Sequence, residues 1–332
     1  MAAMAVLLLL LAVGGAPGQE IRGVCLASLH GRGNGYGSDA CRQQLSEIRA
    51  LGANWVAIND YAWMAGVNQP GVRWRSESPE GDLLQTIRDA HEVGLKVLMK
   101  PHIWARDFGR GGKWHADIRM ATEADWDAWF AAYTEYLVHN AGIAQEGQAD
   151  GFCIGVEYEG TIEQEARWRK LIADVRAVYS GPICYSAAFL EWQKIKWWDA
   201  VDVIGITAYW PVASGENPTD AEIRASWQRV YDELEPFARR WNKHVVFGEL
   251  GYTTHPRTAA EPWSHGRGDA RELQARLYRI AIEECRKRPF VKGVFVWKWF
   301  SGADWYRREP DAFGLQDKAL SLEVLKELWN QP

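Results

Sequence analysis

The sequence lacks the patterns by which several common kinds of protein are identified. Neither a Walker motif nor a GxGxxG motif follows the first predicted strand, and the glycines of "HGRGNGYG" (30–37) miss the dinucleotide-binding spacing. His30, His102 and His115 are scattered and no HxH or HExxH pattern occurs, so no metal site and no cofactor are expected. The five cysteines include no CxxC pair, which argues against structural zinc and redox chemistry.

An excess of basic residues is also missing. The 332 residues include 38 Lys and Arg against 43 Asp and Glu, so no nucleic-acid partner is expected. Charged residues make up 24% of the chain and are dispersed, unlike the composition of a disordered chain. No Pro/Ser-rich linker and no shift in composition mark a boundary. Residues 19–332 are therefore predicted to form a single domain, and we expect a monomer.

Long apolar runs are absent except in the first 18 residues, "MAAMAVLLLLLAVGGAPG". The run at 5–13 is too short to span a bilayer but fits a signal peptide, although no Lys or Arg precedes it. We predict a signal peptide at 1–18 with cleavage after Gly18. The protein is then expected to be secreted or periplasmic and not bound to a membrane.

Export bears on the five cysteines, because an odd number leaves at least one thiol unpaired. Cys25 and Cys41 are the closest pair in sequence and could form a disulfide bridge. Cys153 and Cys184 are interpreted as small apolar core residues.

The rest of the chain repeats one unit, in which a β-rich run is followed by a helical pattern. Most of the runs are continuously apolar, as a sheet covered on both faces requires. Strands are predicted at 21–28, 54–59, 96–104, 151–159, 181–187, 201–209, 244–252 and 291–299. Only a brief helix is expected in "FLEWQKIKWWDA" (189–200). Eight such units predict an α/β fold of the (β/α)₈ barrel type, with a doubly wound open sheet as the alternative.

Polar residues gather where the predicted strands end, which is where a barrel places its active site. Two glutamates stand out because apolar strand precedes each directly: Glu157 follows "FCIGV" and Glu249 follows "VVFG". They lie on the fourth and seventh strands, across the barrel mouth from each other. Paired carboxyl groups over a groove are the machinery of glycoside hydrolysis. Glu159 has the same strand parity as Glu157, but it lies further out and is interpreted as a rim residue.

Other strand-end residues are candidates for binding a sugar. Tyr209 is predicted to hydrogen-bond Glu249, and Lys100 and His102 to bind sugar hydroxyl groups from one strand face. The 19 tryptophans exceed what a core needs, so we expect about half to pack and others to line a groove. The substrate-binding candidates are Asn59, Lys100, His102, Trp104, Tyr209 and Trp297.

Taken in order, several segments resemble glycoside hydrolase family 113, whose characterised members are β-mannanases. The resemblance covers roughly residues 21–330. It rests on "GANWVAI" (52–58), "LMKPHI" (98–103), "KWHADI" (113–118), "WFAAYTEYLVHNAGIAQ" (129–145), "DGFCIGVEYEG" (150–160), "VDVIGITAYWPV" (201–212), "VVFGELGY" (245–252) and "GVFVWKW" (293–299).

The resemblance implies a retaining barrel with Glu157 as acid/base and Glu249 as nucleophile. It also implies sugar-binding roles for His102, Tyr209 and Trp297. Many related retaining barrels carry an Asn directly before the acid/base residue. This chain has Val156 at that position, and family 113 also lacks the Asn.

We therefore expect an exported retaining glycosidase, specifically an endo-β-1,4-mannanase, with carboxyl groups about 5–5.5 Å apart. The alternatives are a β-glycosidase acting on another β-glucan or on oligosaccharides, and a non-catalytic carbohydrate-binding barrel.

Overall fold

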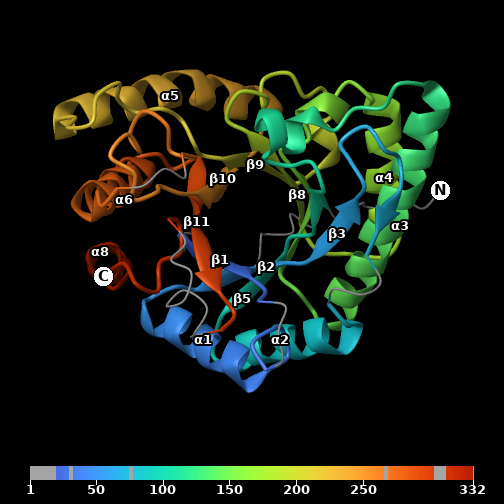
Figure 1. The fold of residues 1–332 in the computed structure, drawn as a ribbon, viewed down its shortest axis with the longest axis horizontal. Coiled ribbons are helices and arrows are strands. Elements are labelled where there is room, and N and C mark those ends of the chain that lie inside the picture. The colour runs from blue at the N-terminus through green and yellow to red at the C-terminus, as the bar shows by residue number, and fades with distance from the viewer. Residues whose placement is uncertain (1–19, 30–32, 75–77, 265–267, 303–311, 332) are drawn as a thin grey trace, which may run out of the picture.

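A closed barrel of eight parallel strands forms the centre of the molecule (Figure 1). The computed structural model describes residues 20–29, 33–74, 78–264, 268–302 and 312–331. Around the barrel, the strand order is β1-β11-β10-β9-β8-β7-β5-β2. The strands are β1 (Ile21–Ala27), β2 (Trp55–Asn59), β5 (Lys96–Met99), β7 (Gly151–Val156), β8 (Ile183–Ala188), β9 (Val203–Thr207), β10 (Val245–Leu250) and β11 (Val291–Phe300). The predicted (β/α)₈ barrel is confirmed, and the open sheet is excluded.

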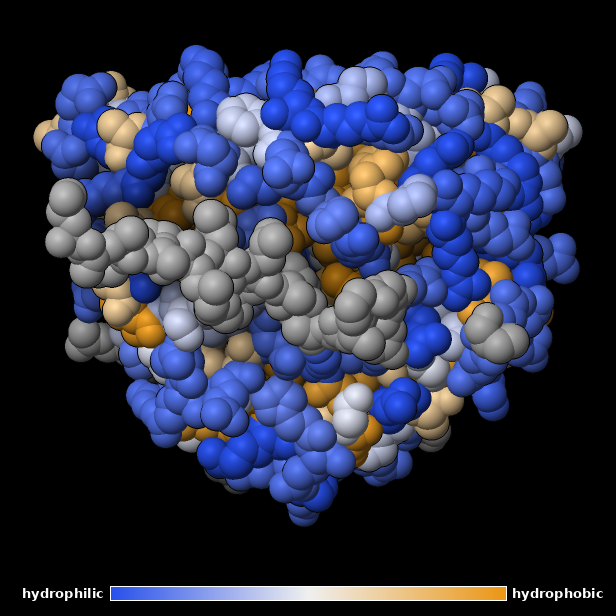
Figure 2. Space-filling view, turned by 180° about the vertical axis from the view of Figure 1, so that it is seen from behind, coloured by the Kyte–Doolittle hydropathy of each residue, from blue (hydrophilic) through white to orange (hydrophobic). Residues whose placement is uncertain are grey.

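The barrel strands are buried on both faces, which explains their continuously apolar sequences. In β1, Cys25 belongs to the cluster that fills the barrel interior, while Val24 and Leu26 belong to the layer between strands and helices. Phe295 of β11 fills the interior beside Gly23, where any side chain would collide with its ring. Side chains therefore fill the barrel interior, and an active site can lie only at a barrel end. Hydrophobic residues lie in a hollow near the middle of the face shown in Figure 2.

Helices surround the barrel (Figure 1). They are α1 (Asp39–Ala50), α2 (Glu80–Glu92), α3 (Glu123–Glu146), α4 (Glu165–Arg176), α5 (Asp220–Trp241), α6 (Arg271–Arg286) and α8 (Ala319–Trp329). Side chains of Ser38 and Thr122 cap the first turns of α1 and α3, and Thr219 forms a capping box with Glu222 at α5. Between β8 and β9 lies only the short 3-10 helix η4 (Trp198–Ala200), so the brief helix predicted there is confirmed.

A second, small sheet lies beside the barrel mouth and was not predicted. It has the order β4-β3-β6, with β3 (Tyr61–Met64), β4 (Val72–Arg73) and β6 (His102–Ala105). The strand predicted at 96–104 was wrong in extent, because it divides at Lys100 and Pro101 into β5 and β6. A proline cannot donate to the barrel ladder, and after it the chain leaves β2 and pairs with β3 instead.

The five cysteines all have free thiols, so a bridge between Cys25 and Cys41 is wrong. Cys25 belongs to the barrel interior, whereas Cys41 on α1 belongs to the layer outside the strands. Cys153 is confirmed as a buried member of the interior cluster, whereas Cys184, opposite it on β8, is partly buried and packs against this cluster.

Among the described residues ten tryptophans are buried, in agreement with the expectation that about half of the 19 pack in the core. The predicted signal peptide, 1–18, lies outside the described residues. Among those described, no helix is both long and apolar enough to cross a membrane.

Candidate active site

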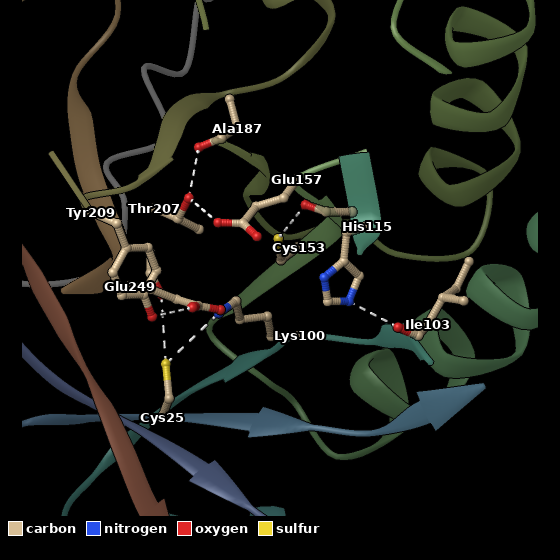
Figure 3. Close-up of polar contacts among 12 residues, drawn as sticks. Cys25, Lys100, Ile103, His115, Cys153, Glu157, Ala187, Thr207, Tyr209 and Glu249 are labelled. Carbon is tan, nitrogen blue, oxygen red and sulfur yellow. Dashed lines mark hydrogen bonds and ion pairs between the residues drawn. The ribbon is translucent and has the colours of Figure 1, made fainter. Parts of the chain in front are cut away.

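Glu157 and Glu249 come together at the C-terminal ends of their strands. Glu157 directly follows β7, and Glu249 is the fifth residue of β10. Both are nearly buried, with 4% and 5% of their surface exposed. Figure 3 shows the two side chains entering the same space from different strands, with the Glu157 carboxyl group beside Thr207 and the Glu249 carboxyl group beside Lys100 and Tyr209. The two glutamates predicted from the sequence are therefore brought together at the barrel mouth.

Both oxygens of Glu249 are held by donors. Lys100 Nζ lies 2.5 Å from Oε1, and Tyr209 Oη donates to Oε2 at 2.8 Å. The predicted hydrogen bond from Tyr209 is thus confirmed. Burial, followed by the charges of Glu249 and Glu157, raises the pKa of Tyr209, so its hydroxyl keeps the proton that it donates. An ammonium group and a phenol together stabilise negative charge on Glu249 and fix its orientation.

Lys100 has a different environment from the one predicted for a sugar-binding lysine. Its side chain is fully buried. Besides Glu249, its ammonium group contacts the Gly248 carbonyl oxygen at 3.2 Å and Cys25 Sγ at 3.8 Å. Burial raises the pKa of Cys25 to about 12, so this thiol is neutral at neutral pH. Glu249 therefore carries the charge that compensates Lys100, whose pKa is raised although burial alone would lower it.

Glu157 adopts a left-handed backbone conformation, with φ of 61°. This region is unfavourable for a residue with a side chain and costs roughly 1–3 kcal/mol, so the surroundings must enforce it. Its backbone N–H donates to the Ser186 carbonyl oxygen of β8 at 2.9 Å. The sharp turn directs the side chain toward Thr207 at the end of β9, 2.5 Å from Glu157 Oε1.

The pKa of Glu157 is raised to about 8, first by burial and then by the negative charge of Glu249; the hydrogen bond with Thr207 and the charge of Lys100 oppose the rise. Glu157 is therefore a neutral acid at neutral pH. Thr207 Oγ1 also lies 3.3 Å from the Ala187 carbonyl oxygen. Since a hydroxyl has one proton, the protonated Glu157 can donate to Thr207 while Thr207 donates to Ala187.

The predicted sugar-binding residues His102 and Asn59 contain buried polar atoms without a hydrogen-bond partner among the described residues. These atoms are Nε2 of His102 and both Oδ1 and Nδ2 of Asn59, near which the Tyr61 side chain lies. Burial, aided by the charge of Lys100, lowers the pKa of His102, so its ring is neutral. A buried polar atom without a partner is what a sugar hydroxyl group could satisfy.

Trp297 and Trp104 occupy different parts of the mouth. The Trp297 ring lies 6.0 Å from the His102 ring, and Lys100 Nζ is 5.4 Å from its centroid, so Trp297 lies beside the lysine that pairs with Glu249. Trp104 lies further out on β6, where it is 43% exposed. It pairs in register with Trp63 of β3, also exposed, and their rings are 6.4 Å apart. Trp63 was missed because the small sheet that carries it was not predicted.

His115 also belongs to this region, although the sequence placed it apart from His102. Their rings are 6.2 Å apart, so the view that these two histidines are scattered is wrong. His115 Nε2 hydrogen-bonds the Ile103 carbonyl oxygen at 2.9 Å, and burial lowers its pKa to about 4. In the described part of the chain, no group of three or more His, Cys, Asp or Glu could hold a metal ion.

Glu159 lies on the rim, as the sequence interpretation expected. It begins the 3-10 helix η3 (Glu159–Thr161) and forms an ion pair with Lys194. Thr207 was not among the candidates, although it stands two residues before Tyr209 at a strand end and could have been found there.

Comparisons with known proteins agree with this geometry. The model of glycoside hydrolase family 113 matches residues 27–313. The chain is similar to the structure of a β-mannanase of that family from Alicyclobacillus acidocaldarius in complex with ManMIm, with 25% identity over 94% of this chain and 98% of that one and a TM-score of 0.82. Another structure, of a β-1,4-mannanase of the same family, is 24% identical over 95% and 100%, with a TM-score of 0.81. A comparison with curated proteins gave no match.

Proposed function

Since the chain belongs to glycoside hydrolase family 113, we propose that it is a retaining endo-β-1,4-mannanase. The observation that carries the proposal is the pair of carboxyl groups in opposite environments. Glu249 accepts hydrogen bonds from the Lys100 ammonium group and the Tyr209 phenol, which favour its carboxylate form. Burial and the charge of Glu249 favour the protonated form of Glu157. Two carboxyl groups of opposite protonation state are what acid-assisted nucleophilic displacement requires.

In the first step, a Glu249 oxygen attacks the anomeric carbon while the glycosidic C–O bond breaks. The bonding electrons leave with the glycosidic oxygen, which takes the Glu157 proton. Glu157 is then a carboxylate and Glu249 is an ester. When the leaving sugar departs, Glu249 no longer carries the charge that raised the pKa of Glu157.

In the second step, Glu157 accepts a proton from water as the water oxygen attacks the anomeric carbon. The bond to Glu249 breaks, and its oxygen regains a full charge beside Lys100 and Tyr209. Both residues return to their starting protonation states, and two displacements retain the anomeric configuration.

Carbohydrate is the substrate class of a glycoside hydrolase, and the surrounding residues support a chain of sugars. Trp297 is proposed to stack with the sugar beside the scissile bond, with His102 and Asn59 bonding its hydroxyl groups. The exposed Trp63–Trp104 pair lies beyond them and offers two indole faces to a more distant sugar. Mannan is proposed because the structurally similar family members are β-mannanases. Export is proposed from the apolar run at 5–13.

A reducing-sugar assay on mannan, glucomannan, cellulose and xylan tests this function, with Glu157→Gln and Glu249→Gln as controls. The proposal predicts the highest rate on mannan and loss of activity in both variants. A higher rate on another glycan would replace mannan as the substrate, and undiminished activity in both variants would refute the mechanism. Binding of mannan with no release of reducing ends from any glycan would indicate a carbohydrate-binding barrel.

A further inference from the structure

A third carboxyl group, Glu191, is buried near the site but takes no part in the reaction described above. It follows β8 by three residues and is fully buried. Burial raises the pKa of Glu191 to about 8, so it is a neutral acid at neutral pH. The hydrogen bonds of this buried carboxyl group need an explanation, because burial of a polar group is costly unless the group is hydrogen-bonded.

Hydrogen bonds connect Glu191 to the backbone of the acid/base. Glu191 Oε1 accepts from the Ala188 N–H and from Tyr185 Oη, both at 2.9 Å. Tyr185 Oη in turn accepts from the Tyr158 N–H at 2.9 Å. Because the amide can only donate, the single phenol proton must point to Glu191, and the direction of the chain of bonds is fixed.

The Tyr158 amide belongs to the peptide that follows Glu157. The amide that precedes Glu157 is its own N–H, which is bonded to the Ser186 carbonyl oxygen. Both peptides around the Glu157 Cα are therefore held by β8, one through its backbone and one through the Tyr185 side chain. Without the second contact, nothing on β8 would hold the peptide after Glu157 in the left-handed turn.

We propose that Tyr185 and Glu191 are positioning residues for the acid/base: they fix the peptide after Glu157 and so hold its carboxyl group where it can protonate the leaving oxygen. The inference rests on the proposed function. Neither residue touches the substrate. Tyr185 lies in the layer between barrel and helices, where it packs edge-on against Trp168 and Trp197.

Removing a positioning residue and removing a purely structural residue should slow different sets of substrates. A sugar or a weakly acidic phenol leaves only as the neutral group, so its departure requires a proton from Glu157. A strongly acidic phenol can leave as the anion and depends little on that proton. A displaced Glu157 should thus slow reactions with poor leaving groups selectively. A loosened fold would slow all substrates alike.

The experiment measures kcat/KM on aryl β-mannobiosides whose phenols span a range of acidity, for wild type and Tyr185→Phe. We expect Tyr185→Phe to lose tenfold or more on the least acidic phenol and to stay near wild type on the most acidic one. Tyr179→Phe is the matched control. It removes a buried hydroxyl that bonds the Ala149 carbonyl oxygen, before β7 begins, and should leave the dependence on leaving group unchanged.

Two Glu191 variants provide a second measurement if Tyr185→Phe does not fold. Glu191→Gln keeps an oxygen that can accept both bonds and resembles the neutral acid, so it should retain the wild-type dependence. Glu191→Leu removes the acceptor and should behave like Tyr185→Phe.

Two results would overturn the inference: an equal loss on all phenols, or no loss in Tyr185→Phe and Glu191→Leu while Glu157→Gln shows the selective loss. A wild-type enzyme that releases no phenol and no reducing sugar would instead refute the proposed function, and the inference with it.

Discussion

Single residues set the chemical difference between the two glutamates. Glu249 lies inside β10 and receives donors from Lys100 and Tyr209, whereas Glu157 lies just past β7 in a strained turn with Thr207 as its contact. The sequence predicted both glutamates because apolar strand precedes each one. It did not predict the left-handed turn, because Glu rarely adopts this conformation and only the surrounding contacts enforce it.

The first prediction concerns pH. The pKa of Glu157 is raised to about 8, and its protonated form is the acid, so kcat/KM should be constant well below pH 8, reach half of that value at about pH 8, and fall about tenfold per unit well above it. Glu157→Gln cannot titrate, and on an aryl glycoside with a strongly acidic phenol it should lack this alkaline limb. Rate profiles over pH 5–10 for both proteins would check this; an identical limb in the variant would assign the titration to another group.

Lys100 is the residue whose role the sequence predicted least well. Its place with His102 on one face of a predicted strand suggested a sugar contact, but the buried ammonium group pairs with Glu249 instead. Lys100→Met should leave Glu249 as a buried, poorly paired charge, with a loss of about 3–5 kcal/mol in unfolding free energy and at least tenfold in kcat.

Denaturant titration and steady-state kinetics would measure both effects of Lys100→Met. Lys298→Met is the matched control, because it removes an ammonium group that is also 5.4 Å from the Trp297 ring, whereas the ammonium group that pairs with Glu249 belongs to Lys100. A loss as large in Lys298→Met would place the effect at Trp297 instead.

Among the elements, the small sheet β4-β3-β6 extends the mouth on one side. The barrel strands were predictable from their apolar runs, whereas the end of β5 was not placed correctly. Pro101 was the available signal, since a proline interrupts a central strand. Where β3 would pair could not be deduced, because strand pairing depends on contacts between segments far apart in sequence.

This sheet predicts how activity depends on substrate length. Trp63→Ala and Trp104→Ala should each lower kcat/KM on mannan about tenfold, equivalent to about 1.4 kcal/mol, and leave aryl mannobiosides almost unaffected. The corresponding Phe variants keep an aromatic face and should retain most of the activity. Assays on mannan-oligosaccharides of increasing length would test this, and equal losses at every length would contradict it.

At the scale of the whole molecule, the barrel separates its inside from its outside, and this separation decides the fate of the cysteines. Proximity in sequence suggested a bridge between Cys25 and Cys41, but a strand side chain facing inward cannot meet a helix packed outside. Short sequence separation alone carries no information on which face of a strand a residue occupies.

Thermal unfolding should therefore have the same midpoint with and without a reductant. A native disulfide would contribute about 2–4 kcal/mol, so its reduction would lower the midpoint. Differential scanning calorimetry of the oxidised and reduced protein would check this. A lower midpoint under reduction would indicate a disulfide bridge and would contradict the free thiols of the structure.

The central claim is that Glu249 forms a covalent bond to the sugar while Glu157 transfers the proton. The most direct measurement is peptide mapping by mass spectrometry after incubation with a 2-deoxy-2-fluoro-β-mannoside carrying a good leaving group, which slows the second step. The account predicts one fluorosugar per molecule, attached to Glu249, and none in Glu249→Gln. A label on another residue, or none while the wild type still turns over the unmodified substrate, would contradict it.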